Sequence, residues 1–467
     1  MMFDPITATA GEIAQAVRSR RTTAVHVAET LLARIAITHA RINAFTAVTA
    51  ERALQEAAAV DATIYAGRDP GPLAGAPYAV KNLFDLAGVV TVAGSKINRD
   101  DPPATRDATA VARLHAAGAV CLGALNMGEY AYDFTNENSH DGAVRNPRDL
   151  TRSAGGSSGG SGAAVAAGLV SFALGTDTNG SIRVPSSFCG IWGLKPTYGR
   201  LSRVGSFPFV DSLDHIGPFA RSVGDLAAAY DAMQGPDHAD AACAQRAIEP
   251  TVSQIESGCT GIRVAVLGGY FDQGGEPAVH AAVAKVAGAL GTKRRVELPE
   301  PQIARAAAYL ITAGESGQFH LGRLRQRAAD FDPPIRDRLL AGALTPAAWL
   351  LQAQRFRAWW RDQVREVFQD VDVLLAPATP LAAPVLGQDT FIFDGRVVPL
   401  RPSIGLFTQP ISFIGLPVVA APVHSVGTMP VAVQLIAAPW NEAALLRVAR
   451  ELEKTGVCTA PVATLPS

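Results

Sequence analysis

The chemistry of this sequence is concentrated in a stretch of glycine and serine, GGSSGGSG, at residues 155–162. Five glycines and three serines occur there in eight residues, and a run of small apolar residues follows. Three ordinary interpretations are a flexible linker, a loop that binds phosphate, and a sharp strand-to-helix turn that exposes a nucleophilic serine. Each interpretation makes a different demand on the flanking residues.

The flanking residues argue against all three interpretations. Gly/Ser linkers join solvated segments, whereas this stretch leads into an apolar helix that has to be buried. A phosphate-binding loop of the P-loop type needs Lys and then Ser or Thr after its last glycine, and here two alanines follow Gly162. Gly156–Gly160 fits G-x-S-x-G with Ser158 as nucleophile. The preceding VRNPRDLTRSA, however, is charged and broken by proline, which makes a poor strand.

Two further stretches supply groups that a serine nucleophile needs. Residues 175–187, GTDTNGSIRVPSS, place Gly180 and Ser181 after a tight polar turn, where successive backbone N–H groups can stabilise an oxyanion. Lys81 ends a short apolar strand, Tyr78–Val80, where loss of water disfavours the charged amine. Each residue alone also has an ordinary structural interpretation. Lys81 could be a solvated residue at the end of a strand, and Ser181 could simply cap a turn.

The elements that must position these groups follow from periodicity and turn residues. DATAVARLHAAGAVCLGALNM predicts a helix, a stop at Gly118 and a buried strand Val120–Leu125, which is an αβ unit typical of a parallel or mixed sheet. Long helices are expected near Tyr309 and over TPAAWLLQAQRFRAWWRDQVREVF. Late strands are expected in DVDVLLAPAT, GLPVVAAPV and MPVAVQLIAAP, and NEAALLRVARELEK is expected as a closing helix. No repeat or linker divides the chain, which favours one large α/β domain.

Composition narrows the class of protein. The chain has 467 residues, of which 48% are hydrophobic and 18% charged, as in large α/β enzymes whose strands are covered on both faces. A net charge of −1, without a block of Lys and Arg, argues against direct binding to nucleic acid. Five scattered cysteines indicate reduced thiols and a cytoplasmic protein.

Targeting and cofactor signals are also missing from the sequence. The N-terminus does not have the pattern of a signal peptide, and the longest apolar run, from Gly162, is shorter than the roughly 20 residues of a membrane span. We therefore expect no membrane association. No metal-ligand cluster or cofactor fingerprint occurs, so no cofactor is expected.

Lys81, the GGSSGGSG stretch and TDTNGSIRVPSSFCGIWGLKPTYGRLSR together resemble the amidase signature family of Ser-Ser-Lys amidohydrolases. INAF, AGAPYAVKN, GLPVVAAPV and MPVAVQL fall in the order of the family, so the resemblance covers most of the chain. It implies an α/β fold, a single large domain over 1–467 with a mixed, mostly parallel central β-sheet covered on both faces by helices. Within it we expect a signature core at about 75–220, a variable helical region at about 221–370 and C-terminal core strands and a helix at about 371–467.

The resemblance also implies a role for each residue of a catalytic triad. Ser181 is the nucleophile that attacks an amide carbonyl and carries the acyl group as an ester. Ser157, expected on a cis peptide after Gly156, relays the proton. Lys81, uncharged at rest, is the base that accepts this proton and returns it to the leaving nitrogen. Burial lowers a lysine pKa by up to about 3–5 units, which makes an uncharged lysine feasible near neutral pH.

Other groups are expected to support this triad. The oxyanion hole is expected from the main-chain N–H groups of Thr178, Asn179, Gly180 and Ser181. The side chain of Ser158 is expected to hydrogen-bond the relay. Asp177 and Arg183 are expected to form a structural ion pair that fixes the loop.

Two branches of the family fit the sequence. NENS, RNP, GLKPTYGRLSR and SLDHIGP match the amidase subunit of tRNA-dependent amidotransferases, which would make the chain a glutaminase. Asn179 in place of a usual glycine and Ser412 in place of a usual asparagine resemble instead amidases that act on 1-carboxybiuret. Tyr130, Tyr132 and Asp133 replace small residues in NMGEYAYDFTNEN and agree with that second branch.

The second branch implies hydrolysis of the terminal amide of 1-carboxybiuret, which releases ammonia and leaves urea-1,3-dicarboxylate; another small amide stays an alternative substrate. The candidate substrate contacts are Asn179, Tyr130 and Asp133. Asn179 is expected to narrow the oxyanion loop and to hydrogen-bond a ureido group. An anionic substrate also requires an arginine in the pocket, which the sequence does not identify. The resemblance further implies a small helical partner subunit in a heteromeric assembly.

Overall fold

A computed structural model of the chain describes residues 3–425 and 427–465. An eleven-stranded β-sheet forms its centre, in the order β1-β3-β2-β8-β10-β9-β16-β17-β13-β11-β12. In chain order, these strands are β1 (Phe45–Val48), β2 (Pro77–Lys81), β3 (Val120–Leu125), β8 (Phe172–Thr176), β9 (Trp192–Lys195), β10 (Ile216–Ala220), β11 (Val264–Leu267), β12 (Arg295–Val296), β13 (Val373–Pro377), β16 (Val418–Val423) and β17 (Val431–Ala437). Three small two-stranded sheets lie outside it: β4 (Glu137–Asn138) with β5 (Gly142–Ala143), β6 (Arg145–Asn146) with β7 (Asp149–Ser153), and β14 (Thr390–Phe393) with β15 (Arg396–Pro399).

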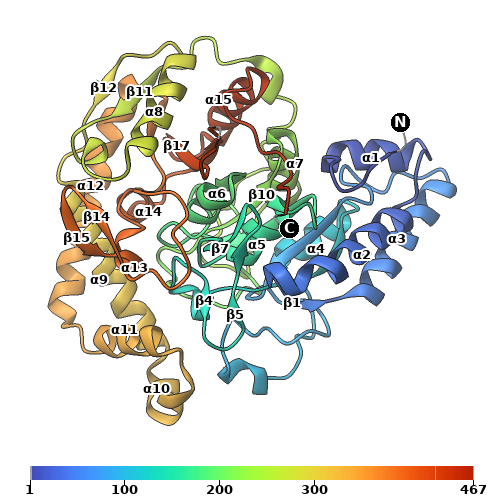
Figure 1. The fold of residues 1–467 in the computed structure, drawn as a ribbon, viewed down its shortest axis with the longest axis horizontal. Helices are drawn as coiled ribbons and strands as arrows, with labels where there is room; N and C mark the ends of the chain where they lie inside the picture. The colour runs from blue at the N-terminus through green and yellow to red at the C-terminus, as the bar shows by residue number, and fades with distance from the viewer. Residues whose placement is uncertain (1–2, 426, 466–467) are drawn as a thin grey trace.

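Helices surround this sheet, with the N-terminal helices at one end of the molecule and α9–α12 at the other (Figure 1). They are α1 (Ala10–Arg18), α2 (Ala24–Ile42), α3 (Ala50–Tyr65), α4 (Thr109–Ala116), α5 (Gly159–Ala166), α6 (Arg183–Cys189), α7 (Val223–Met233), α8 (Pro277–Ala289), α9 (Pro301–Phe319), α10 (Leu321–Arg327), α11 (Pro333–Ala343), α12 (Ala347–Asp370), α13 (Leu400–Ser403), α14 (Gln409–Phe413) and α15 (Glu442–Lys454). Among the described residues, no helix combines the length and apolarity that crossing a membrane requires.

The sheet is mixed, as expected, but the prediction that it is mostly parallel was wrong. Parallel pairing is confined to β3-β2-β8 and to β13-β11-β12. The strands between these two groups pair antiparallel throughout, and β1 pairs antiparallel with β3. The predicted αβ unit before β3 is present, but it describes only one end of the sheet. Short connections such as the one between β16 and β17 permit the antiparallel pairing elsewhere.

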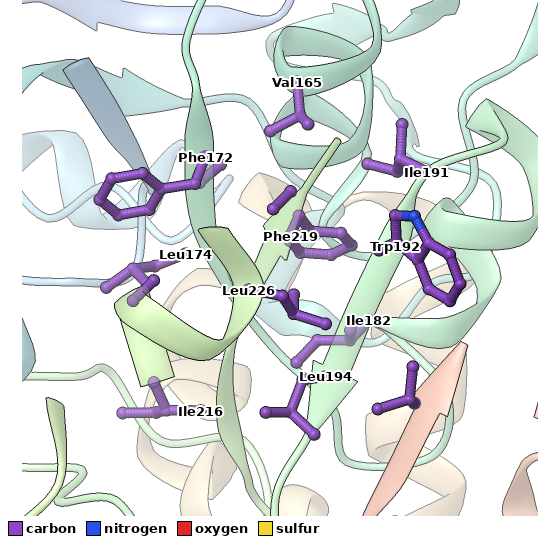
Figure 2. Close-up of a cluster of buried hydrophobic side chains, with 14 of the residues drawn as sticks. Val165, Phe172, Leu174, Ile182, Ile191, Trp192, Leu194, Ile216, Phe219 and Leu226 are labelled. Atoms are coloured by element: carbon purple, nitrogen blue, oxygen red, sulfur yellow. The ribbon is translucent and has the colours of Figure 1, made fainter. Parts of the chain in front are cut away.

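The central strands are buried on both faces, as their continuous apolar sequences predict. Every residue of β8, β9, β10, β16 and β17 is buried. The helices α5 and α7 both pack on β10, and α6 and α15 both pack on β16 and β17. Figure 2 shows part of the resulting core, where Phe172 and Leu174 of β8, Phe219 of β10 and Trp192 of β9 lie in one cluster.

Most elements expected from periodicity are confirmed at their predicted places. The expected strand at Tyr78–Val80 is β2, and the expected strand Val120–Leu125 is β3 with the same bounds. The three late apolar stretches form β13, β16 and β17, and the closing amphipathic helix is α15. Local pattern was sufficient here because each segment has a strong period and clear turn residues at its ends.

The long helices of the region 301–370 form a layer beside the sheet. Helix α9 packs against α11, α12 and α14. Its buried face carries small residues, among them Ala304, Ala308 and Gly317. Gly317 lies so close to the backbone of α11 that an added Cβ would come within 2.3 Å of the Ala343 nitrogen. The layer is therefore closely packed and holds the side chains of α9 and α11 at fixed places near the carboxyl ends of β2 and β8.

Truncation of the core leucine Leu194 tests this packing. Leu194 is fully buried on β9 (Figure 2), whereas Leu344, at the end of α11, is 82% exposed. We expect Leu194→Ala to lower the free energy of unfolding by about 2–5 kcal/mol, because it leaves a cavity in a close-packed core. The same substitution at Leu344 should change that free energy by less than about 0.5 kcal/mol. Urea denaturation of the two variants measures the difference, and equal effects would contradict the described core.

Candidate active site

The carboxyl ends of β2 and β8 place two candidate residues side by side. The two strands run parallel, with Val80 opposite Leu174, so Lys81 and Thr176 follow at the same edge of the sheet. The Lys81 amine is hydrogen-bonded to the Thr176 hydroxyl at 2.9 Å. It is also hydrogen-bonded to the hydroxyl of Ser157, in the glycine-serine stretch, at 2.7 Å. The structure therefore joins two of the three predicted triad residues directly.

The environment of Lys81 favours an uncharged amine. The side chain is fully buried, and this burial lowers the pKa of the Lys81 amine to about 7. The carboxylates of Asp214 and Asp177 oppose the shift, since negative charge favours the protonated amine. At neutral pH a substantial fraction of Lys81 is therefore neutral and able to accept a proton.

The glycine-serine stretch is a buried loop that leads into α5 and not a solvated linker. All of residues 155–162 are buried, and α5 begins within the stretch at Gly159. An added Cβ at Gly160 would lie 2.4 Å from the Asn126 carbonyl oxygen, so only glycine fits there. The peptide bond between Gly156 and Ser157 is cis, as the resemblance implied. The Ser158 hydroxyl donates to the Thr176 carbonyl at 3.2 Å and ties the loop to the end of β8, whereas its expected hydrogen bond to the relay Ser157 does not occur among the described residues.

Ser181 lies on the wall of a cavity next to the loop that follows β8. The preceding Gly180 has a φ of +144°, and a Cβ there would lie 2.4 Å from the Thr408 hydroxyl. Residues of the loop, the sheet edge and the surrounding helices line the cavity: Ala131, Tyr132, Asp133, Phe134, Thr178, Asn179, Ser181, Phe209, Tyr309, Thr312, Arg338, Arg401, Pro402 and Gln409.

The backbone of residues 178–181 presents unused donors. In the part of the chain that the structure describes, the N–H groups of these four residues donate to no protein acceptor. The next two N–H groups, of Ile182 and Arg183, both donate to the Asp177 carboxylate. Free N–H groups beside a nucleophile are the arrangement that stabilises a developing oxyanion.

The ion pair expected between Asp177 and Arg183 is confirmed and lies beneath this loop. Two hydrogen bonds of 2.9 Å join the guanidinium to the two carboxylate oxygens, and both side chains are fully buried. Burial alone would raise the pKa of Asp177, but the charge and hydrogen bonds of Arg183 hold it well below its usual range. Arg183 also donates to Gln434 at 2.6 Å, and Ser412 donates to Asp177 at 3.2 Å. Ser412 thus belongs to the support of the loop and not to the cavity wall.

Two of the three candidate substrate contacts lie in the cavity wall, and the third does not. Asn179 and Asp133 line the cavity. Asn179 donates to the Thr312 hydroxyl at 2.9 Å, and its buried Oδ1 has no hydrogen-bond partner among the described residues. Tyr130, the third candidate, lies outside the lining of this cavity. Its ring packs 4.1 Å from that of His320, and its hydroxyl donates to Asn98, so the backbone directs this side chain away from the cavity.

Two arginines in the cavity wall were not identified from the sequence. Arg401 pairs with Glu137 at 2.8 Å and lies 3.7 Å from Asp133. Arg338, on α11, donates to the Tyr132 carbonyl at 3.1 Å and lies over the Tyr132 ring. No ion pair of Arg338 with a carboxylate occurs within the described residues. Only the packing of α9 and α11 against the sheet edge brings Arg338 to the cavity, so no local sequence signal marks it.

Comparison with known proteins agrees with this geometry. The sequence pattern of the Amidase family matches residues 26–446, and the chain belongs to that family. It is an amidohydrolase. The chain is 55% identical to the AtzE subunit of 1-carboxybiuret hydrolase from Pseudomonas sp. (strain ADP), over 96% of this chain and 98% of that protein. It is 39% identical to the A subunit of glutamyl-tRNA(Gln) amidotransferase from Anaeromyxobacter sp. (strain K), over 95% of this chain and 94% of that protein.

Solved structures give the same order of similarity. One similar solved structure comes from a vestigial protein complex that reveals the evolutionary origins of an s-triazine catabolic enzyme. It has a TM-score of 0.96 and is 55% identical in sequence, and the match covers 97% of this chain and 100% of that chain. The A subunit of glutamyl-tRNA(Gln) amidotransferase from Thermotoga maritima has a TM-score of 0.83 and 29% identity, covering 100% and 99% of the two chains.

Proposed function

We propose that this enzyme hydrolyses the terminal amide of 1-carboxybiuret through a serine acyl-enzyme, releasing ammonia and leaving urea-1,3-dicarboxylate. The observation that carries the proposal is a buried Lys81 amine 2.7 Å from Ser157, together with a cavity lined by both Ser181 and Arg338, which has no carboxylate partner among the described residues. The 55% identity to one subunit of a 1-carboxybiuret hydrolase supports this substrate.

In this proposal the proton of Ser181 passes through Ser157 to Lys81. The Ser181 oxygen attacks the amide carbonyl as its proton moves to the Ser157 hydroxyl, while Ser157 gives its own proton to the neutral amine. The N–H groups of residues 178–181 stabilise the oxyanion of the tetrahedral intermediate. Protonated Lys81 returns the proton, again through Ser157, to the leaving nitrogen, and ammonia departs. Water then attacks the ester by the same steps, and Ser181 is restored.

Arg338 is the group that we propose for the carboxylate end of the substrate. Its guanidinium retains donors beyond the one bonded to Tyr132, whereas Arg401 is already engaged by Glu137 and Asp133. A guanidinium presents a fork of donors that matches a carboxylate. Asn179, with its free Oδ1, is positioned between Ser181 and Thr312 to accept a hydrogen bond from a ureido N–H.

A glutaminase within a tRNA-dependent amidotransferase is the second candidate function. The extensive similarity to glutamyl-tRNA(Gln) amidotransferase chains favours it, and glutamine also carries a carboxylate and a terminal amide. The substitution of Asn179 for the usual glycine counts against it.

We further propose that the enzyme has a small helical partner subunit, and that it is located in the cytoplasm. A similar solved structure comes from a protein complex, which supports a partner. Three large apolar side chains are exposed within the eight residues 344–351: Leu344 at 82%, Trp349 at 56% and Leu351 at 62%. Exposed apolar side chains that lie together mark interaction surfaces.

The proposed location in the cytoplasm is supported by the free thiols, four of which are buried, because free cysteines are typical of a reducing compartment.

A substrate panel tests the proposed function. We expect ammonia release from 1-carboxybiuret to exceed that from glutamine by at least about 100-fold in kcat/KM. Assays with and without a co-expressed small subunit show whether the partner is required. Ser181→Ala should lower kcat by at least about 10³-fold, because it removes the nucleophile. Preference for glutamine would replace the proposal by the second candidate.

The pH dependence tests Lys81 as the base. Since the pKa of Lys81 is about 7 and only the neutral amine accepts a proton, activity should fall as the pH falls below 7. The decrease in kcat/KM should approach about tenfold per pH unit on the acid side. Initial rates of ammonia release between pH 5 and 9 measure it, and a flat acid limb would exclude a lysine base.

Replacement of Arg338 tests recognition of the carboxylate. We expect Arg338→Met to raise KM by about 10- to 100-fold with kcat nearly unchanged, because a charged hydrogen bond contributes about 1.5–3 kcal/mol. Arg336→Met is the matched control: Arg336 lies on the same helix, pairs with Asp337 at 2.9 Å and is absent from the cavity wall. Equal KM values for the two variants would contradict the role of Arg338.

A further inference from the structure

The segment 209–214, just before β10, runs beside the loop that carries Ser181. The loop follows β8, and β8 pairs antiparallel with β10, so the two segments meet at the same edge of the sheet. Two backbone hydrogen bonds, of 2.9 and 3.2 Å, join Asp177 and His215 at their point of contact. Phe209, at the start of the segment, lines the cavity. The segment is thus an immediate neighbour of the loop.

Asp214 holds the segment and the loop together with a single carboxylate. Its Oδ1 accepts a hydrogen bond of 2.5 Å from the hydroxyl of Thr178. Its Oδ2 accepts from the N–H groups of Phe209 and Val210, at 2.8 and 2.9 Å. Thr178 is the first residue of the 178–181 backbone whose N–H groups are free, so Asp214 fixes one end of that backbone.

The other side of the segment is anchored to the helical layer. The backbone N–H and the hydroxyl of Ser212 donate to Glu315 of α9, at 3.2 and 2.6 Å. The Ser212 carbonyl accepts from Arg357 of α12 at 2.8 Å. Helices α9 and α12 therefore hold the segment against the loop, which leaves Asp214 little freedom to move.

The charge of Asp214 also acts on the base. Burial lowers the pKa of the Lys81 amine, and two negative charges oppose this shift. The charge of Asp214 raises the pKa more than that of Asp177 does. The charge of Asp177 is balanced by Arg183 at 2.9 Å. Burial raises the pKa of Asp214, whereas the hydrogen bonds from Thr178, Phe209 and Val210 and the charge of Arg203 oppose this shift and stabilise the carboxylate. The charge of Asp214 in turn contributes to the raised pKa of the neighbouring Tyr198.

We propose that Asp214 is a positioning residue for acylation, which holds the Thr178 end of the oxyanion-stabilising backbone and supplies the negative charge that the Lys81 base faces. This inference rests on the proposed function only in taking Ser181 as the residue that is acylated. It does not depend on the identity of the amide. Asp214 itself touches neither the cavity nor the triad hydroxyls, and acts through Thr178 and Lys81.

Asp214→Asn is the direct test. The amide keeps the shape of the side chain but removes the charge and replaces one of the two accepting carboxylate oxygens by a donor. We expect kcat for ammonia release to fall by about 10- to 100-fold with KM changed by less than about threefold. The acid limb of the pH profile should move to lower pH, since loss of a nearby negative charge favours the neutral Lys81 amine. A residue with a merely structural role would not move this limb.

Asp225→Asn is the matched control, and Thr178→Val separates the two effects. Asp225 accepts from the N–H groups of Ala10 and Gly11 at 2.8 and 3.1 Å and caps α1 outside the cavity wall, so its replacement should leave kcat and the acid limb unchanged. Thr178→Val removes the hydrogen bond but keeps the charge of Asp214. It should lower kcat without moving the acid limb to lower pH. This variant also probes the contact if Asp214→Asn does not fold.

Labelling by a fluorophosphonate distinguishes failure of this inference from failure of the proposed function. In the full-length wild-type enzyme the reagent should modify Ser181, and the labelling rate should fall about tenfold or more in Asp214→Asn and Thr178→Val. Wild-type rates in both variants, or an unmoved acid limb in Asp214→Asn, would overturn the role of Asp214 alone. Labelling of the wild type at another residue would overturn the proposed nucleophile, and this inference with it.

Discussion

Burial of the Lys81 amine is the constraint on which the rest of the site depends. A charged amine without a paired carboxylate is expensive to bury, so a fully enclosed lysine is held partly neutral. The two hydroxyls within hydrogen-bond distance of Lys81, those of Ser157 and Thr176, provide polar contacts without a formal charge. The carboxylates of Asp177 and Asp214 act from further away and keep the pKa of the amine near neutrality. The same burial that costs folding free energy thus leaves part of the Lys81 amine uncharged near neutral pH, as the proposed role of this amine as a base requires.

Several contacts fix the loop that carries Ser181, and they satisfy different buried charges and backbone polar groups. The Asp177–Arg183 pair satisfies two buried charges and two backbone N–H groups beneath the loop. Thr408 donates to the Asn179 carbonyl at 2.6 Å, and its own carbonyl accepts from Arg183 at 3.0 Å. These contacts fix the loop while leaving its remaining N–H groups without protein partners. Donors that are fixed in advance need no reorganisation when charge develops, which is how an enzyme stabilises a transition state more than its substrate.

Sequence reasoning succeeded where function depends on contiguous residues and failed where it depends on packing between distant segments. The serine loop, Lys81 and the Asp177–Arg183 pair are marked by local composition and by the resemblance that these motifs carry. Arg338 is brought to the cavity by the fold of α9 and α11, which no local period encodes. Tyr130 and Tyr132 are two residues apart, and only the backbone path decides which of them faces the cavity. The direction of the central strands likewise follows from connections that one αβ unit does not reveal.

The cavity wall has two origins. Its reacting side comes from the segments that follow β3 and β8, where a Cβ added at Gly180 would lie 2.4 Å from the Thr408 hydroxyl. Its outer side comes from Tyr309 and Thr312 of α9, Arg338 of α11 and Arg401 of α13. Evolution can therefore exchange helical side chains to admit new amides while the bond-breaking apparatus stays intact. In the proposed function Arg338 meets the carboxylate-bearing acyl part of the substrate and not the departing ammonia, so substitutions on these helices change which acyl group the cavity accepts.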